Sequence, residues 1–222
     1  MAEPFPLYVP PEARRLFQSE SLLRRFAQTA RWDDESSLLE LHGSLGALAL
    51  TRALGCHLTV IEPDERVADT LKERARLGAI GDKVAIKHGP VAAVAFAERA
   101  FDGIFSFGRI IGNTAAVAKR WRPNLAFNGR LGMTVVVRVG RSPSPKALEA
   151  WAQRLGATLL TPRDTDLETA LETTDDRDEA GQRALRDEIE LHRAAPTAVS
   201  LGFVVARRKE PGEKPPPSRD GG

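Results

Sequence analysis

Two acids and a short glycine-containing turn are the residues of this chain whose types and spacing suit ligand chemistry. Glu40 ends an apolar run, the turn at residues 42–46 follows it, and Glu62 ends the next apolar run. A helix that begins at such a turn presents unpaired N–H groups, and an acid at the tip of the following strand can accept hydrogen bonds from a ribose diol. We therefore expect a nucleoside-containing cofactor to bind within residues 40–64.

The elements that must position these residues are a strand, a turn, a helix and a second strand. Residues 37–41 and 57–61 are apolar runs that suit short strands, and residues 47–54 are good helix formers. Glycines give the turn its backbone freedom, and Gly55 is placed to end the helix. This order of elements is that of a nucleotide-binding βαβ unit.

The unit resembles the first half of the class I S-adenosylmethionine (SAM)-dependent methyltransferases. Their motif is acid-x-Gly-x-Gly-x-Gly, followed by an acid at the end of the second strand. Glu40 matches the first acid, and Glu62 matches the second, which binds the ribose in the family. The three glycine positions hold His42, Ser44 and Gly46, so only the last glycine is kept. A side chain at either lost position narrows the space in which the backbone meets the methionine portion of the cofactor.

Strands and helices continue to alternate along the chain, which predicts a parallel sheet with helices on both faces. The run LGFVVARRK is similar to the final strand of the family, which lies antiparallel between its neighbours. We therefore expect an α/β, Rossmann-like fold with a seven-stranded, mostly parallel sheet and an antiparallel last strand. Its other strands are expected at residues 84–88, 103–107, 131–139, 158–160 and 198–207, and its other helices at 11–30, 65–77, 91–99, 115–121 and 146–155.

Three segments are expected along the chain. Residues 1–36 form an extended segment and a helix that either covers the sheet or caps the cofactor. Residues 37–209 form the methyltransferase-like domain, with Asn128-Gly129 as a turn before the fifth strand. A charged helical excursion at residues 164–194 suits a substrate lid, a solvated helix or an oligomer interface. The proline- and glycine-rich residues 210–222 are expected to be disordered.

The cofactor is expected across the carboxyl ends of the first, second and fourth strands. The family commonly fixes adenine with the aspartate of a Gly-Asp pair, but this chain has Gly89-Pro90 there, and proline offers no carboxylate. Phe105 and Phe107 either line the transferred methyl group or belong to the core. The expected cofactor-binding residues are Glu40, His42, Gly43, Ser44, Gly46, Glu62, Pro63, Pro90, Val91 and Ser106.

Methyl transfer from a sulfonium depends on alignment more than on a dedicated catalytic group. An oxygen acceptor, or a weakly acidic nitrogen, also needs a base. His42 is the candidate base because it lies in the loop itself, and the alternative is that it only fills the pocket. His88, near the end of the third strand, is a second histidine in reach of the same edge.

Composition and missing motifs narrow the class of protein. A net charge of +2 without a concentrated basic stripe makes nucleic acid an unexpected partner. No metal-ligand cluster, phosphate-binding P-loop or Gly-x-Ser-x-Gly elbow is present. No secretion signal or membrane-spanning run is recognisable, so a cytoplasmic protein is expected. The single Cys56 opens a predicted buried strand and suits a core position.

Three functions stay open on the sequence. The first is a SAM-dependent methyltransferase acting on a small-molecule or protein acceptor. The second is a methyltransferase-fold protein that has lost SAM binding and serves as a regulatory or scaffold partner, for another protein or for a second copy of itself. The third is a module that binds a different nucleotide or metabolite. The substitutions at His42, Ser44 and Pro90 separate the first function from the others.

Overall fold

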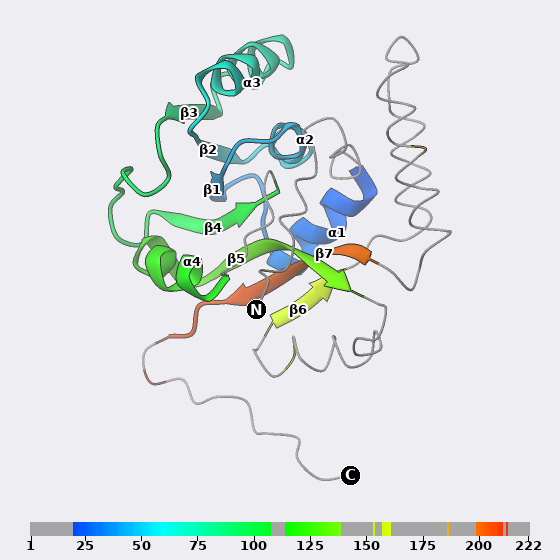
Figure 1. Ribbon diagram of the computed structural model, residues 1–222, viewed down its shortest axis with the longest axis vertical. Coiled ribbons are helices and arrows are strands. Elements are labelled where there is room, and N and C mark those ends of the chain that lie inside the picture. Colours follow the sequence, from blue (N-terminus) through cyan, green and yellow to red (C-terminus); the bar gives the residue numbers. More distant parts are fainter. Residues whose placement is uncertain are drawn as a thin grey trace, which may run out of the picture.

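The computed structural model describes residues 20–107, 114–138, 157–160 and 199–210, together with the single residues 153, 186 and 212. Seven strands form one sheet with the order β3-β2-β1-β4-β5-β7-β6 (Figure 1). The strands are β1 (Ser37–Leu41), β2 (His57–Glu62), β3 (Val84–His88), β4 (Phe101–Ser106), β5 (Leu125–Arg138), β6 (Ala157–Leu160) and β7 (Val199–Arg207). The helices are α1 (Glu20–Ala30), α2 (Leu45–Leu54), α3 (Glu65–Leu77) and α4 (Thr114–Trp121), with a short 3₁₀ turn, η3 (Arg122–Asn124).

The strand directions confirm the predicted fold class. Strands β1 to β5 pair in parallel along the sheet, whereas β7 runs antiparallel to both β5 and β6. The antiparallel last strand therefore lies between its two neighbours, as expected. Because β1, β2 and β4 are parallel, their carboxyl ends meet at one edge of the sheet, which we call the carboxyl edge, and the opposite side is the amino edge.

The boundaries of the first βαβ unit follow from local chemistry. Gly55 adopts a left-handed conformation with φ 80°, and its N–H donates to the carbonyl of Thr51, which ends α2 as predicted. The carboxylate of Asp64 accepts from the N–H groups of Arg66 and Val67 and so caps α3. Such signals depend only on neighbouring residues, which makes these boundaries readable from the sequence.

Two apolar clusters cover the two faces of the sheet. Side chains alternate along β1, so Leu38 packs under α1 and α2, while Leu39 and Leu41 pack on the other face with Trp121 of α4. Glu40 has the same parity as Leu38, and it therefore faces the side of the sheet that α2 covers. This parity decides what the carboxyl group of Glu40 can reach.

An aromatic cluster fixes α1 on the sheet. The ring centroid of Phe26 lies 5.0 Å from that of Trp32 and 4.9 Å from that of Phe107, and the centroids of Trp32 and Phe105 are 5.4 Å apart. Close approach requires a small residue below the indole, because a Cβ on Gly103 would lie 2.3 Å from two ring atoms of Trp32. The described part of the N-terminal helix thus covers the sheet.

Two of the expected elements were wrong. Residues 91–99 do not form a helix, because Phe96 inserts its ring against Phe101 and the side-chain amide of Asn124 donates to the carbonyls of Phe96 and Ala97. The fifth strand does not begin after a turn at Asn128-Gly129. It already begins at Leu125, and Asn128 lies inside β5 with a φ of 62°.

Several expectations concern residues outside the described ranges. These are the extended segment before α1, the start of the helix at residues 11–19, most of the helix at 146–155, the excursion at 164–194 and nearly all of the tail at 210–222. Among the described residues, every helix is too short or too polar to span a bilayer.

The single cysteine of the chain lies in the core between α2 and β2. Cys56 has no exposed surface, and its Sγ is 4.0 Å from the hydroxyl oxygen of Thr51. Burial is the main reason that the pKa of this thiol is raised. The prediction that Cys56 is a small core residue is confirmed.

Candidate functional site

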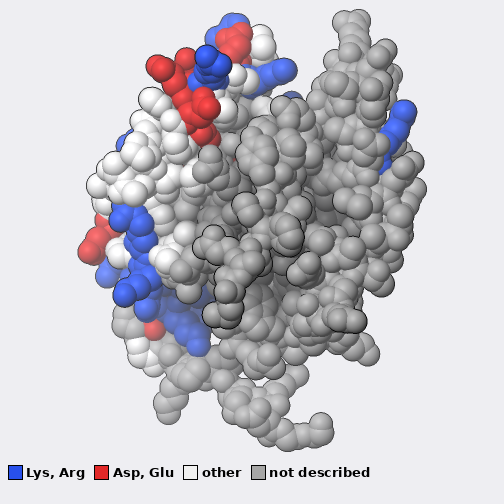
Figure 2. Space-filling model, in the orientation of Figure 1, with Lys and Arg blue, Asp and Glu red and all other residues white. Residues whose placement is uncertain are grey.

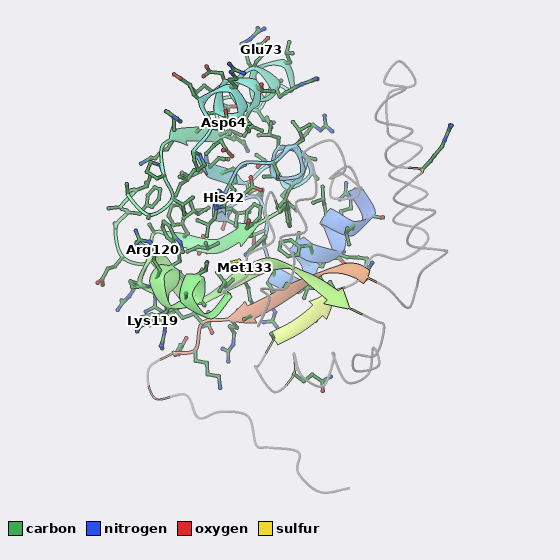
Figure 3. The ribbon with its side chains drawn as sticks, viewed as in Figure 1. His42, Asp64, Glu73, Lys119, Arg120 and Met133 are labelled. Carbon is green, nitrogen blue, oxygen red and sulfur yellow. The ribbon has the colours of Figure 1, made fainter. Side chains whose placement is uncertain are left out.

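The candidate site is the loop of residues 42–44 between β1 and α2 at the carboxyl edge. The N–H of His42 donates to the carbonyl of Ile61 at 2.9 Å, which continues the pairing of β1 with β2 into the loop. His42 lies beside the end of β1, and Asp64 lies at the start of α3 (Figure 3). Two acidic side chains, one from each strand, then fix the rest of the loop.

Glu40 is a fully buried acid that bonds to the loop. Its Oε2 accepts from the N–H of Ser44 at 3.0 Å, and its Oε1 accepts from the hydroxyl of Ser44 at 2.5 Å. Burial raises the pKa of this carboxyl to about 8, and the nearby charge of Glu62 adds to the effect. Hydrogen bonds from Ser44 and from the backbone of Phe107 act in the opposite direction but do not outweigh burial. Glu40 is therefore mostly protonated at neutral pH.

Glu62 holds the loop from the neighbouring strand. Its Oε2 accepts from the N–H of Gly43 at 2.9 Å, and its Oε1 accepts from the N–H of Asp64 at 2.8 Å. The side chain is only 5% exposed. One carboxyl group thus joins the loop after β1 to the loop after β2, and each oxygen keeps a second lone pair for another donor.

The two lost glycine positions differ in backbone conformation. His42 has a φ of 70°, in the left-handed region that favours glycine, whereas Ser44 is extended with φ −144°. Ser44 also caps α2, because its Oγ accepts from the N–H of Ala47 at 3.1 Å. A residue with a side chain therefore has a strained backbone at position 42, whereas the side chain at position 44 forms stabilising hydrogen bonds.

Restoring glycine at the two positions is expected to have opposite effects on stability. His42→Gly should raise the free energy of unfolding by about 0.5–1 kcal/mol, because glycine avoids the cost of the left-handed conformation. Ser44→Gly should lower it by about 1–2 kcal/mol, because it removes the hydroxyl that bonds Glu40 and Ala47. Urea denaturation of the two variants checks this prediction, and a stabilising effect of Ser44→Gly would contradict it.

Gly43 is a constrained glycine that the motif did not identify as a glycine position. A Cβ at Gly43 would lie 2.3 Å from Cδ1 of Leu71 and 3.0 Å from Cγ1 of Val60. Only a residue without a side chain lets the loop lie this close to α3 and β2. Gly46, the glycine that the motif keeps, is buried in the first turn of α2.

The segments after β2 and β3 form a second part of the carboxyl edge. Nε2 of His88 lies 3.1 Å from the carbonyl oxygen of Pro63, and the N–H of Gly89 donates to the carbonyl of Glu62. Pro90 is exposed, and Val91 packs against the apolar cluster of Leu39, Leu41 and Ile61. Pro63 directly follows Glu62, and Pro90 follows the residue whose N–H bonds to Glu62. Both prolines have carbonyls rather than carboxylates to offer.

The residues at the end of β4 are buried. Phe105 and Phe107 have at most 1% exposed surface and belong to the aromatic cluster under α1, so both are core residues. Ser106 is also fully buried. His42 is half-buried, and it is the one imidazole in the loop itself. Within the described ranges, no group of three or more His, Cys, Asp or Glu side chains is arranged to hold a metal ion.

Two cavities that sequence reasoning did not predict lie away from this loop. One, of about 640 Å³, opens at the amino edge next to Ser36 and Asp102, which precede β1 and begin β4. The other, of about 730 Å³, lies between α4 and the end of β7. On the face of the molecule that Figure 2 shows, basic side chains gather over α4 and the end of β7, around this second cavity. The residues that line each cavity come from distant parts of the chain, so no local sequence pattern could have grouped them.

Comparison with known proteins gives a match in structure alone. No protein-family model matches the chain, and no curated protein is similar to it in sequence. A SAM-dependent methyltransferase from Thiobacillus denitrificans, solved with S-adenosylhomocysteine, is similar with a TM-score of 0.61 and 15% identity, over 84% of this chain and 90% of that chain. A SAM-dependent methyltransferase from Geobacter sulfurreducens, also with S-adenosylhomocysteine, has a TM-score of 0.59 and 13% identity, over 89% and 97%.

A third similar structure has a different activity in its name. The [4+2]-cyclase SpnF matches with a TM-score of 0.61 and 14% identity, over 86% of this chain and 81% of that chain. These similarities, together with the strand order, show that the chain has the class I SAM-dependent methyltransferase fold. At such low identity they show the fold alone.

Proposed function

We propose that this protein binds SAM at the carboxyl edge and transfers its methyl group to a small-molecule or protein acceptor. The observation that carries the proposal is the position of Glu62. Its buried carboxylate stands at the tip of β2, bonds the N–H of Gly43 and keeps acceptor capacity beside the start of α2. In this fold, that is the place from which an acid can accept hydrogen bonds from a ribose.

The neighbouring residues suit the other parts of the cofactor. The loop at Gly43 and Ser44 would face the methionine portion, and Val91 offers an apolar surface to the adenine ring. SAM would supply an electrophilic methyl group on its sulfonium, so the main task of this chain is to bind and orient donor and acceptor. His42 is the residue that we assign as base for an acceptor that must lose a proton.

Isothermal titration with SAM and with S-adenosylhomocysteine tests the proposal. We expect both ligands to bind with micromolar affinity, and Glu62→Ala to weaken binding about tenfold or more, because hydrogen bonds to a charged group are lost. Asp82→Ala, which changes an exposed acid in a turn, is the matched control and should bind as the wild type does. Circular dichroism of each variant shows whether the fold is intact.

Glu62→Gln separates the charge from the loop geometry. Its amide oxygen can still accept from one loop N–H, so this variant should keep more of the affinity than Glu62→Ala. No heat and no thermal shift with either ligand at millimolar concentration would contradict the proposal. The protein would then have the fold without the chemistry, and the search would turn to regulatory or scaffold partners.

A further inference from the structure

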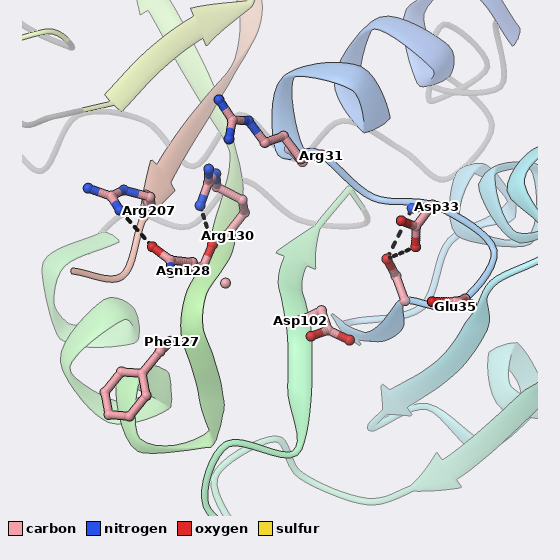
Figure 4. A pocket seen from close by; sticks show the side chains of 11 residues that line it. Arg31, Asp33, Glu35, Asp102, Phe127, Asn128, Arg130 and Arg207 are labelled. Atoms are coloured by element: carbon pink, nitrogen blue, oxygen red, sulfur yellow. Dashed lines mark hydrogen bonds between the residues drawn. The ribbon is translucent and has the colours of Figure 1, made fainter. Parts of the chain in front are cut away.

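The cavity at the amino edge has two walls of opposite charge. One wall carries Arg31, Arg130 and Arg207, and the other carries Asp33, Glu35 and Asp102 (Figure 4). Arg31 directly follows α1, Arg130 lies in β5 and Arg207 is the last residue of β7. The cavity has a volume of about 640 Å³, which is within the range of small-molecule sites in proteins.

The arginine wall concentrates positive charge. Arg130 and Arg207 stand directly opposite each other in the antiparallel pairing of β5 with β7. Like charges in this arrangement repel each other and destabilise the sheet. Burial, together with the positive charges of Arg31 and Arg207, lowers the pKa of the Arg130 guanidinium. Within the described part of the chain, no acid forms an ion pair with Arg31 or Arg130. This repulsion would be relieved by an anion in the cavity.

One residue holds two of these guanidinium groups in place. The side-chain Oδ1 of Asn128 accepts from Arg207 at 2.6 Å, and the backbone carbonyl of Asn128 accepts from Arg130. The left-handed backbone of Asn128, with its φ of 62°, therefore brings a side-chain acceptor and a main-chain acceptor to the same place. The two arginines are positioned before any ligand arrives, which lowers the entropic cost of binding.

The acidic wall is also fixed by the backbone. Oδ2 of Asp102 accepts from the N–H of Ser37 at 3.0 Å, and Oδ1 of Asp33 accepts from the hydroxyl of Ser36 at 2.8 Å. Their carboxylates keep lone pairs that can accept from hydroxyl or amino groups. These negative charges also disfavour a long polyanion, because its second and third phosphates would meet them.

The neighbouring cavity is less suited to an anion. Its Arg208 donates to the backbone carbonyls of Arg122, Pro123 and Leu125 and lies 4.8 Å from the ring centroid of Phe127. The guanidinium of Arg208 therefore has a structural role. In the amino-edge cavity, by contrast, the bonds to Asn128 leave further donors on Arg130, because a guanidinium carries five N–H groups.

We propose that the amino-edge cavity binds a small phosphomonoester, with its phosphate on Arg31, Arg130 and Arg207 and its hydroxyl groups on Asp33, Glu35 and Asp102. A guanidinium matches a phosphate with two parallel hydrogen bonds, and a dianion balances more of the crowded positive charge than a carboxylate does. The volume leaves room for the body of a sugar beside the phosphate. This site lies at the opposite edge of the sheet from the proposed SAM site and does not depend on it.

Ribose 5-phosphate is the probe that tests the proposal, by isothermal titration with the full chain. We expect saturable binding that weakens with added salt, and at least a tenfold loss of affinity in Arg130→Gln. Arg66→Gln changes an exposed arginine at the start of α3 and should bind as the wild type does. Because Arg130→Gln relieves repulsion, its melting temperature should not fall, so a loss of binding is not explained by unfolding.

Three further ligands distinguish this proposal from the alternatives. Ribose should give no heat, and inorganic phosphate should bind more weakly than ribose 5-phosphate, because it cannot use the acidic wall. Equal binding of phosphate and ribose 5-phosphate would overturn the role of the acids, and equal binding by Arg130→Gln and Arg66→Gln would overturn the site. A single-stranded oligonucleotide that binds more tightly than ribose 5-phosphate would overturn the assignment to a small ligand. The affinity for S-adenosylhomocysteine should be the same in Arg130→Gln as in the wild type, whatever its value.

Discussion

Replacement of Glu40 by glutamine is expected to make the protein more stable at pH 8 but not at pH 5. The folded protein keeps a proton on Glu40 up to a pKa of about 8, while the unfolded chain releases it near the ordinary value of 4.5. Between these values the folded state binds more protons, so the contribution of Glu40 to stability falls as pH rises. The slope is about 1.4 kcal/mol per pH unit, and the whole effect reaches up to about 5 kcal/mol.

The difference between the variant and the wild type isolates this group from the other titrating residues. Glutamine cannot ionise, yet its amide oxygen can accept from the N–H of Ser44 and its amide N–H can donate to the hydroxyl of Ser44. Urea unfolding at pH 5, 6, 7, 8 and 9 should show an advantage for Glu40→Gln that grows to pH 8 and then levels off. Glu73→Gln, at an exposed position, should show no such growth. A constant difference across pH would mean that Glu40 titrates normally.

Replacement of Gly103 by alanine is expected to destabilise the protein by about 3 kcal/mol. The new Cβ would lie 2.3 Å from Cε2 and Cζ2 of Trp32, and 2.6 Å from its Nε1. The indole cannot move aside easily, because its ring packs edge-on against Phe26 and at a tilt against Phe105. Relief therefore requires a shift of the whole aromatic cluster or of α1.

Urea denaturation of Gly103→Ala, with Gly81→Ala as the control, checks this expectation. A Cβ at Gly81 would meet only backbone atoms of Arg76 at 3.8 Å or more, an ordinary contact. The double variant Gly103→Ala with Trp32→Phe should recover part of the lost stability, because a smaller ring leaves room for the methyl group. If Gly103→Ala and Gly81→Ala were equally stable, the close contact between β4 and Trp32 would be wrong.

Much of the fold could be predicted, because helix boundaries depend on neighbouring residues and because the order of elements resembles a known one. Gly55 and Asp64 mark helix boundaries through bonds to residues a few positions away, and the antiparallel last strand was inferred from its similarity to a known order of elements. The helix expected at residues 91–99 failed because ring packing of Phe96 and bonds from Asn124 override helical preference there. Tertiary contacts of this kind leave no periodic pattern in a sequence.

At the candidate site, the sequence predicts the positions of two acids but not their contacts. The sequence placed Glu40 and Glu62 at the ends of their strands, but not the hydrogen bonds through which both hold the loop. Those bonds depend on side-chain parity and on the distance between β1 and β2. The need for glycine at Gly43 depends on Leu71 of α3, which is far along the chain. The charged cavity at the amino edge combines still more distant segments.

The buried thiol of Cys56 gives the protein a reporter of its own opening. It is the single cysteine of the chain, it has no exposed surface, and it lies between the helix and the strand that frame the candidate loop. A thiol reagent can therefore reach it only when this unit opens, and the labelling rate measures the free energy of that opening. Any ligand that stabilises the unit will slow the labelling, whereas one that acts elsewhere without coupling to it will not. Ligands can thus be assigned to a site without attaching a probe.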